Sequence, residues 1–351
     1  MNTPGPRRRP VAKLPLPAQR YLRQLARFEQ AAQRALAAHR AQPALPIGDH
    51  LYRADGRTPM FYLQGLARLT RAMGPARKCF EPWLGEFKEV EDRLGAYDFW
   101  VVLERNALDW GVDTAVSSHI AGRRLQALGA LEYALGRFGW LTYHEGAPEG
   151  IGPMPERLRE DVTEAEWLSP KRERRRLAEF LHHEAEEIQD DLTSGRLKLS
   201  EVEAGVHELR RKLRWIPIYG HALGGKVVLD TAGADDALAH YVTPDQLKSR
   251  FNRLPRNAAE TKPLKLHRGA FLAIGRLIAE IGMLKDRALW TEELTRICRL
   301  LKADTDATLQ RMGPTAIGHK QFMAEVSQIV DRILIQEGAL RIMAEHLREQ
   351  D

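Results

Sequence analysis

Apolar residues recur at helical spacing along almost every long segment of this 351-residue chain. Because an α-helix has 3.6 residues per turn, a spacing of i, i+3, i+4 and i+7 places apolar side chains on one helix face. Only residues 226–229 have the composition of a strand, and no hairpin partner adjoins them. We therefore predict an all-α protein with little or no strand. The predicted helices cover residues 18–39, 60–73, 83–94, 120–138, 171–192, 200–216, 266–284, 292–301 and 320–348.

Two stretches interrupt the helical pattern. Residues 144–170 are rich in Gly, Pro and Glu, which is typical of a connector. Residues 230–263 are rich in Asp, Asn and Pro, and we expect one short helix there, around residues 244–253. The predicted organisation is a disordered basic tail (1–17), a first helical bundle (18–143), the connector (144–170) and a second helical bundle (171–351).

Composition and charge limit the classes of function. Hydrophobic residues make up 44% and charged residues 28% of the chain, which argues against global disorder. The net charge of +6 favours anionic partners. The chain has no stretch of 18 apolar residues, so we predict no membrane insertion. The two cysteines, Cys79 and Cys298, lie far apart without a CxxC motif, which disfavours a disulfide framework and indicates a cytoplasmic protein.

The segment 206–216 carries two stripes at helical spacing. The apolar stripe consists of Val206, Leu209, Leu213 and Ile216. The basic stripe on the neighbouring face consists of His207, Arg210, Arg211 and Arg214. Like charges at this spacing repel by about 0.2–0.5 kcal/mol per pair on an isolated helix. Either water solvates the basic face or an anion binds to it, and we expect Pro217 to interrupt the helix just beyond.

The two halves of the chain resemble each other. Residues 61–74 align with 207–220 without a gap, and residues 91–98 parallel 279–286. Such a repeat predicts two helical bundles related by an approximate two-fold axis. The aligned pairs include Leu63 with Leu209, Arg68 with Arg214, Gly74 with Gly220 and Gly95 with Gly282.

The second half carries a family-like pattern. A helix with a His-x-Leu-Arg start and further arginines precedes a helix with Ile-Gly-x-x-x-Asp, and this pattern resembles the CHAD family. The resemblance covers about residues 63–301 and is weaker in the first half, where Phe61 stands in place of the expected histidine. It implies an all-helical fold of two four-helix repeats whose basic inner surfaces bind inorganic polyphosphate. The matching residues are His207, Leu209, Arg210, Arg214, Ile281, Gly282, Lys285 and Asp286.

The resemblance implies a set of polyanion contacts. Arg and Lys form charge-assisted hydrogen bonds with phosphate oxygens, and we expect the contacts to line one positive groove. Each of these residues taken singly is also compatible with an ordinary surface cation. The candidates are His207, Arg210, Arg211, Arg214, Lys226, Lys265, His267, Arg268 and Lys285 in the second half, with Arg68, Arg71 and Lys78 in the first.

Metal and catalytic patterns are weak. Glu179 and His182 have the Glu-x-x-His spacing of di-iron bundles, but a second copy is missing, so we predict neither a metal site nor a cofactor. We find no nucleophile or general base to assign. The sequence therefore predicts a non-enzymatic protein that binds polyphosphate or another linear polyanion. The alternatives are a helical nucleic-acid-associated or protein-scaffolding module and, less favoured, an enzyme acting on a phosphorylated substrate.

Overall fold

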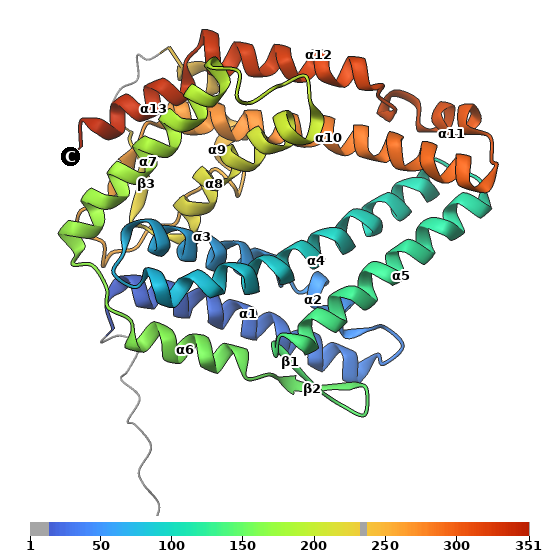
Figure 1. The fold of residues 1–351 in the computed structure, drawn as a ribbon, viewed down its shortest axis with the longest axis horizontal. Coiled ribbons are helices and arrows are strands. Elements are labelled where there is room, and N and C mark those ends of the chain that lie inside the picture. Colours follow the sequence, from blue (N-terminus) through green and yellow to red (C-terminus); the bar gives the residue numbers. More distant parts are fainter. Residues whose placement is uncertain (1–13, 232–236, 351) are drawn as a thin grey trace, which may run out of the picture. The chain divides into compact units, whose positions relative to one another are not determined.

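The computed structural model describes residues 14–231 and 237–350, and it is mostly helical (Figure 1). Helices account for 73% and strands for 5%, which confirms the predicted all-α class. Most of the predicted basic tail lies outside the described residues. Among the described helices, none combines the length and the low polarity that crossing a bilayer requires.

Contacts divide the chain into two compact units. Unit 1 takes residues up to Asp98 together with Gln126–Ser169, and unit 2 takes Phe99–Leu125 together with Pro170–Asp351. This division differs from the predicted one. It falls within α4 (Arg77–Asp109) and α5 (Thr114–Arg137) instead of in a connector. Composition marks irregular segments, whereas the contacts of continuous helices decide which residues pack together.

Unit 1 is built around the N-terminal helix, against which α2, α3 and α6 pack. The first helix buries Phe28, whose ring meets Trp140 edge-to-face at 5.0 Å between centroids. The complete helices and strands of this unit are α1 (Leu16–Ala41), α2 (Ile47–Arg53), α3 (Arg57–Met73), β1 (Leu141–His144), β2 (Ala147–Ile151) and α6 (Met154–Glu164).

The segment 144–170, which we predicted as a connector, is largely folded. It contributes to the antiparallel hairpin β1–β2 and contains α6. Glu145 and Gly146 form the turn with φ values of 49° and 82°, as the commonest two-residue hairpin turns require. The Gly and Pro residues that predicted irregular structure therefore belong in part to a tight turn and a helix start.

Unit 2 is organised around the long helix α10, which packs against α8, α11, α12 and α13. Helices α7 and α13 lie side by side (Figure 1). The elements of this unit are α7 (Pro170–Thr193), a π-helical turn (Val202–His207), α8 (Glu208–Ala222), β3 (Val227–Leu229), a 3-10 turn (Ala239–Tyr241), α9 (Pro244–Lys248), β4 (Leu264–Leu266), α10 (Arg268–Leu301), α11 (Thr305–Met312), a second 3-10 turn (Gly313–Thr315), α12 (His319–Val330), a second π-helical turn (Asp331–Gln336) and α13 (Ala339–Arg348).

The predicted strand and short helix are both present in unit 2. Strand β3 pairs in parallel with β4, so that Val227 lies opposite Leu264. A parallel partner far along the chain explains why the sequence showed no hairpin. The short helix expected at 244–253 is α9, which ends at Lys248.

Candidate anion-binding site

Helix α8 buries the predicted apolar stripe. Leu209 and Leu213 have no exposed surface, and Ile216 is 3% exposed. The helix begins at Glu208, because residues 202–207 form the π-helical turn. It continues through Pro217 to Ala222, so the predicted interruption does not occur. The buried residues on both sides of the proline hold α8 in place, and this packing outweighs the lost backbone hydrogen bond.

Arg210 crosses α10 at a glycine. Its guanidinium Nη2 lies 3.0 Å, and its Nε 3.3 Å, from the point where a β-carbon on Gly282 would sit. A side chain at position 282 would compete for this space. The Ile-Gly-x-x-x-Asp pattern thus has a structural reason, since the glycine allows an arginine of α8 to lie directly on α10.

Lys285 lies one turn beyond Gly282 and close to two arginines. Its side chain is 19% exposed, and its Nζ is 3.6 Å from Asp286 Oδ1. Burial lowers the pKa of Lys285, and the charges of Arg210 and Arg214 lower it further, while Asp286 acts in the opposite direction. We name Arg210, Arg214 and Lys285 the α8–α10 basic cluster.

The α8–α10 basic cluster is suited to bind an anion. It brings three positive charges together, and Asp286, whose side chain is 49% exposed, supplies one negative charge nearby. Partly buried positive groups repel one another, and an anion bound between them relieves this repulsion. The planar guanidinium groups of two arginines and the ammonium group of a lysine can also donate hydrogen bonds to phosphate oxygens.

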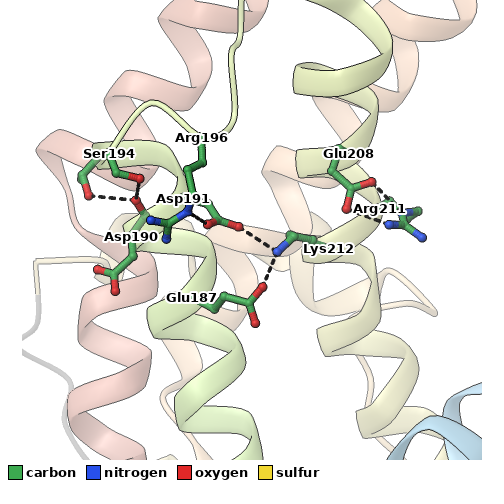
Figure 2. A network of polar contacts seen from close by, with 9 residues as sticks. Glu187, Asp190, Asp191, Ser194, Arg196, Glu208, Arg211 and Lys212 are labelled. Carbon is green, nitrogen blue, oxygen red and sulfur yellow. Dashed lines mark hydrogen bonds and ion pairs between the residues drawn. The ribbon is translucent and has the colours of Figure 1, made fainter.

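Two further basic residues of α8, Arg211 and Lys212, have carboxylate partners (Figure 2). Arg211 donates two hydrogen bonds to Glu208, at 2.8 and 2.7 Å, and these lower the pKa of Glu208. Lys212 Nζ lies 2.6 Å from Glu187 and 2.8 Å from Asp191. Glu208 therefore neutralises the charge of Arg211 within α8 itself.

Asp191 connects this network to α7. Burial would raise its pKa, but hydrogen bonds from Lys212 and Arg196 lower it below the ordinary value. Arg196 Nε lies 2.5 Å from Asp191 Oδ1 (Figure 2). This network joins α7 to α8 and is structural, because each cation in it faces a carboxylate.

Lys226, which we predicted as a polyanion contact, is a buried counter-ion. Only 2% of the residue is exposed. Its Nζ lies 3.4 Å from Glu260 Oε2 and 3.8 Å from Glu173 Oε2, and both carboxylates are themselves buried. A polymer outside the protein has no access to this ammonium group. The position belongs to the core of unit 2.

Three further candidates gather at the start of α10. Lys265 pairs with Asp230 at 3.4 Å, and the ring of His267 accepts the backbone N–H of Ala270 at 3.1 Å as an N-cap. Arg268 is the first residue of the helix. With a rise of 1.5 Å per residue, Arg268 stands about 25 Å along the helix from Lys285. The structure therefore does not bring these residues into the α8–α10 basic cluster.

Unit 1 contains a related arrangement that is internally neutralised. Arg57 of α3 lies over Gly95 of α4, as Arg210 lies over Gly282. Its guanidinium donates to Glu91 at 2.9 and 3.0 Å and to Asp98 at 3.2 Å. The aligned glycines therefore both receive an arginine. In unit 1 two carboxylates contact the arginine, and in unit 2 Lys285 lies close to Arg210.

Sequence reasoning missed Arg57, because the alignment of 61–74 on 207–220 places Gln64 opposite Arg210. The signal was present as an arginine about two turns earlier on the same helix. The predicted first-half contacts lie elsewhere, with Arg68 half-buried and both Arg71 and Lys78 exposed. That these three share a groove with Arg210 and Arg214 stays a prediction, and His207 is half-buried in the π-helical turn.

The two residues of the Glu-x-x-His pattern, Glu179 and His182, are engaged in other contacts. Glu179 pairs with Arg176 at 3.2 Å, and the two ring nitrogens of His182 lie 3.0 Å from the Ala344 carbonyl and 3.2 Å from Glu186. Within residues 14–231 and 237–350, no group of three or more His, Cys, Asp or Glu side chains is arranged to hold a metal ion.

Comparison with known proteins adds no assignment. No family model, no curated protein and no solved structure matches this chain.

Proposed function

We propose that this chain binds inorganic polyphosphate, or another linear polyanion, without catalysing a reaction on it. The observation that carries the proposal is the α8–α10 basic cluster, in which Lys285 lies beside Arg210 and Arg214 and has a lowered pKa. The resemblance of residues 206–216 and 281–286 to the CHAD family supports the same ligand class. We place this binding in the cytoplasm, in keeping with the free state of Cys79 and Cys298.

A polymeric ligand suits this site better than a small phosphate. Each charge-assisted contact contributes about 1.5–3 kcal/mol at best, so a chain that reaches several cations gains more than a ligand that touches one. A polymer also releases counterions when it binds, so its affinity should fall steeply with added salt. A helical nucleic-acid-associated or scaffolding module is the alternative that uses the same basic surfaces.

We expect polyphosphate to bind far more tightly than pyrophosphate. The measurement is a calorimetric titration with polyphosphate, pyrophosphate, duplex DNA and single-stranded RNA at matched phosphate concentration, in low and in high salt. Equal affinity for polyphosphate and pyrophosphate, or no binding in low salt, would contradict the proposal. A preference for nucleic acid that disappears when Arg210 and Arg214 are replaced would support the alternative.

The lowered pKa of Lys285 predicts a pH dependence of binding. A bound polyanion raises this pKa, so the complex holds more protons than the free protein between the two pKa values. Affinity should therefore decrease as pH rises through that window. The Lys285→Arg variant should show a smaller decrease as the pH rises toward the ordinary pKa of lysine, because arginine stays protonated. Titrations at constant ionic strength measure the difference, and parallel pH profiles for the two proteins would exclude this role for Lys285.

A further inference from the structure

The loop between α9 and β4 carries a second concentration of positive charge, in unit 2. All of its basic side chains are exposed, and among the described residues none of them forms an ion pair. The only carboxylate of this stretch, Glu260, is buried against Lys226. We name Lys248, the last residue of α9, and the following residues 249–262 together the basic loop. Its exposed cations are Lys248, Arg250, Arg253, Arg256 and Lys262.

An aromatic ring stands exposed among these charges. Phe251 is 61% exposed, and the guanidinium carbon of Arg250 lies 4.8 Å from the centre of its ring. The backbone carbonyl of Phe251 is 2.9 Å from His221 Nε2, which ties this part of the loop to α8. The ring of Phe251 is thus exposed to solvent, while its backbone is held against α8 by the contact with His221.

The basic loop packs closely against two helices at positions where a glycine leaves room for its side chains. Asn252 is 6% exposed, and its Oδ1 lies 2.6 Å from the point where a β-carbon on Gly275 of α10 would sit. A side-chain carbon of Leu254 lies 2.8 Å from the equivalent point on Gly220 of α8. Asn252 and Leu254 therefore point into the protein, while Phe251 and Arg253, which alternate with them along the chain, are exposed. This anchoring lowers the entropic cost of binding a ligand.

We propose that the basic loop binds single-stranded nucleic acid, with one base stacked on Phe251 and the cations in contact with phosphates. Aromatic rings beside positive charge are the recurring platform for unpaired bases. Polyphosphate has no flat apolar face for the ring, and the bases of a duplex are stacked inside it. A membrane surface fits less well, because Asn252 and Leu254 are directed inward and Phe251 is the only large apolar side chain exposed within residues 248–262. The loop contacts α8 at Gly220 and α10 at Gly275, which lie about 9–10 Å along these helices from Arg214 and Gly282. The inference goes beyond polyphosphate binding.

The test uses the full chain and a fluorescein-labelled oligouridine of about 12 nucleotides, followed by fluorescence anisotropy. Phe251→Ala should weaken binding at least fivefold, since stacking of one base contributes about that factor or more. Phe251→Leu should lose affinity to a similar degree, because it keeps an apolar surface but removes the ring. Phe251→Trp should bind at least as tightly as the parent chain.

Two comparisons make the test specific. Phe251→Ala should leave polyphosphate affinity unchanged, and replacing Arg210 and Arg214 should leave oligouridine affinity within about twofold, so each site can fail independently. Circular dichroism checks that the variants are folded. Unchanged oligouridine binding in Phe251→Ala would overturn the proposal. So would tight binding to phosphatidylserine vesicles that depends on Phe251 while oligouridine binding does not.

Discussion

Replacing Lys226 with methionine is expected to lower the free energy of unfolding by about 3–5 kcal/mol. Methionine nearly preserves the volume of the side chain but leaves Glu173 and Glu260 buried without their counter-ion. A buried charge that loses its partner retains the cost of its lost hydration. The variant also distinguishes a core position from a ligand contact, because substituting an exposed cation rarely changes stability by more than about 0.5 kcal/mol.

Urea unfolding followed by circular dichroism measures this change. Lys320→Met provides the matched control, because Lys320 is exposed on α12 and its substitution should leave stability nearly unchanged. Adding Glu173→Gln and Glu260→Gln to Lys226→Met should recover much of the loss, since the core then holds no uncompensated charge. A single Lys226→Met variant as stable as the parent chain would show that the carboxylates do not depend on this ammonium group.

Replacing Arg210 and Arg214 together with alanine should weaken polyphosphate binding at least tenfold. Loss of even one net contact of about 1.4 kcal/mol corresponds to that factor. Both side chains contribute to the positive field at Lys285, so their removal takes away most of the charge of the α8–α10 basic cluster. Titration calorimetry in low salt measures the change.

The control for this variant removes the same charge elsewhere in unit 2. Arg296 and Arg341 are exposed and pair with glutamates of their own helices, so replacing both with alanine should change polyphosphate affinity less than threefold. If both double variants lose affinity equally, net charge and not the cluster determines binding.

Gly282→Ala tests the cluster without removing a charge. The added methyl group would sit 3.0 Å from Arg210 Nη2, so the flexible guanidinium must move away. Alanine in a helix is favoured over glycine by about 1 kcal/mol, so this variant should fold at least as well as the parent chain. It should nevertheless bind polyphosphate more weakly, and this combination separates a displaced arginine from a folding defect.

An arginine lies over a glycine in both units, and the sequence alignment of the two halves identified only part of this equivalence. The alignment paired Gly95 with Gly282, and in the structure an arginine side chain lies against each of these glycines. It did not identify Arg57, because a shift of about two turns along one helix preserves the same apolar pattern. Periodicity places a residue on a face, but it does not fix how far one helix slides along another.

The sequence alone determined the helical class and the two stripes of α8, because spacing along a helix is a local property that backbone geometry sets. It also predicted the short strand at 226–229, whose partner only the folded chain supplies at Leu264–Leu266. The tertiary structure decided that Lys226 is a buried counter-ion instead of an exposed cation. Lys226 is neutralised by carboxylates that lie 53 residues before it and 34 residues after it, and these three segments meet only in the folded chain. The residue type fixes the charge of a side chain, but whether a carboxylate neutralises that charge depends on which distant segments pack against the residue.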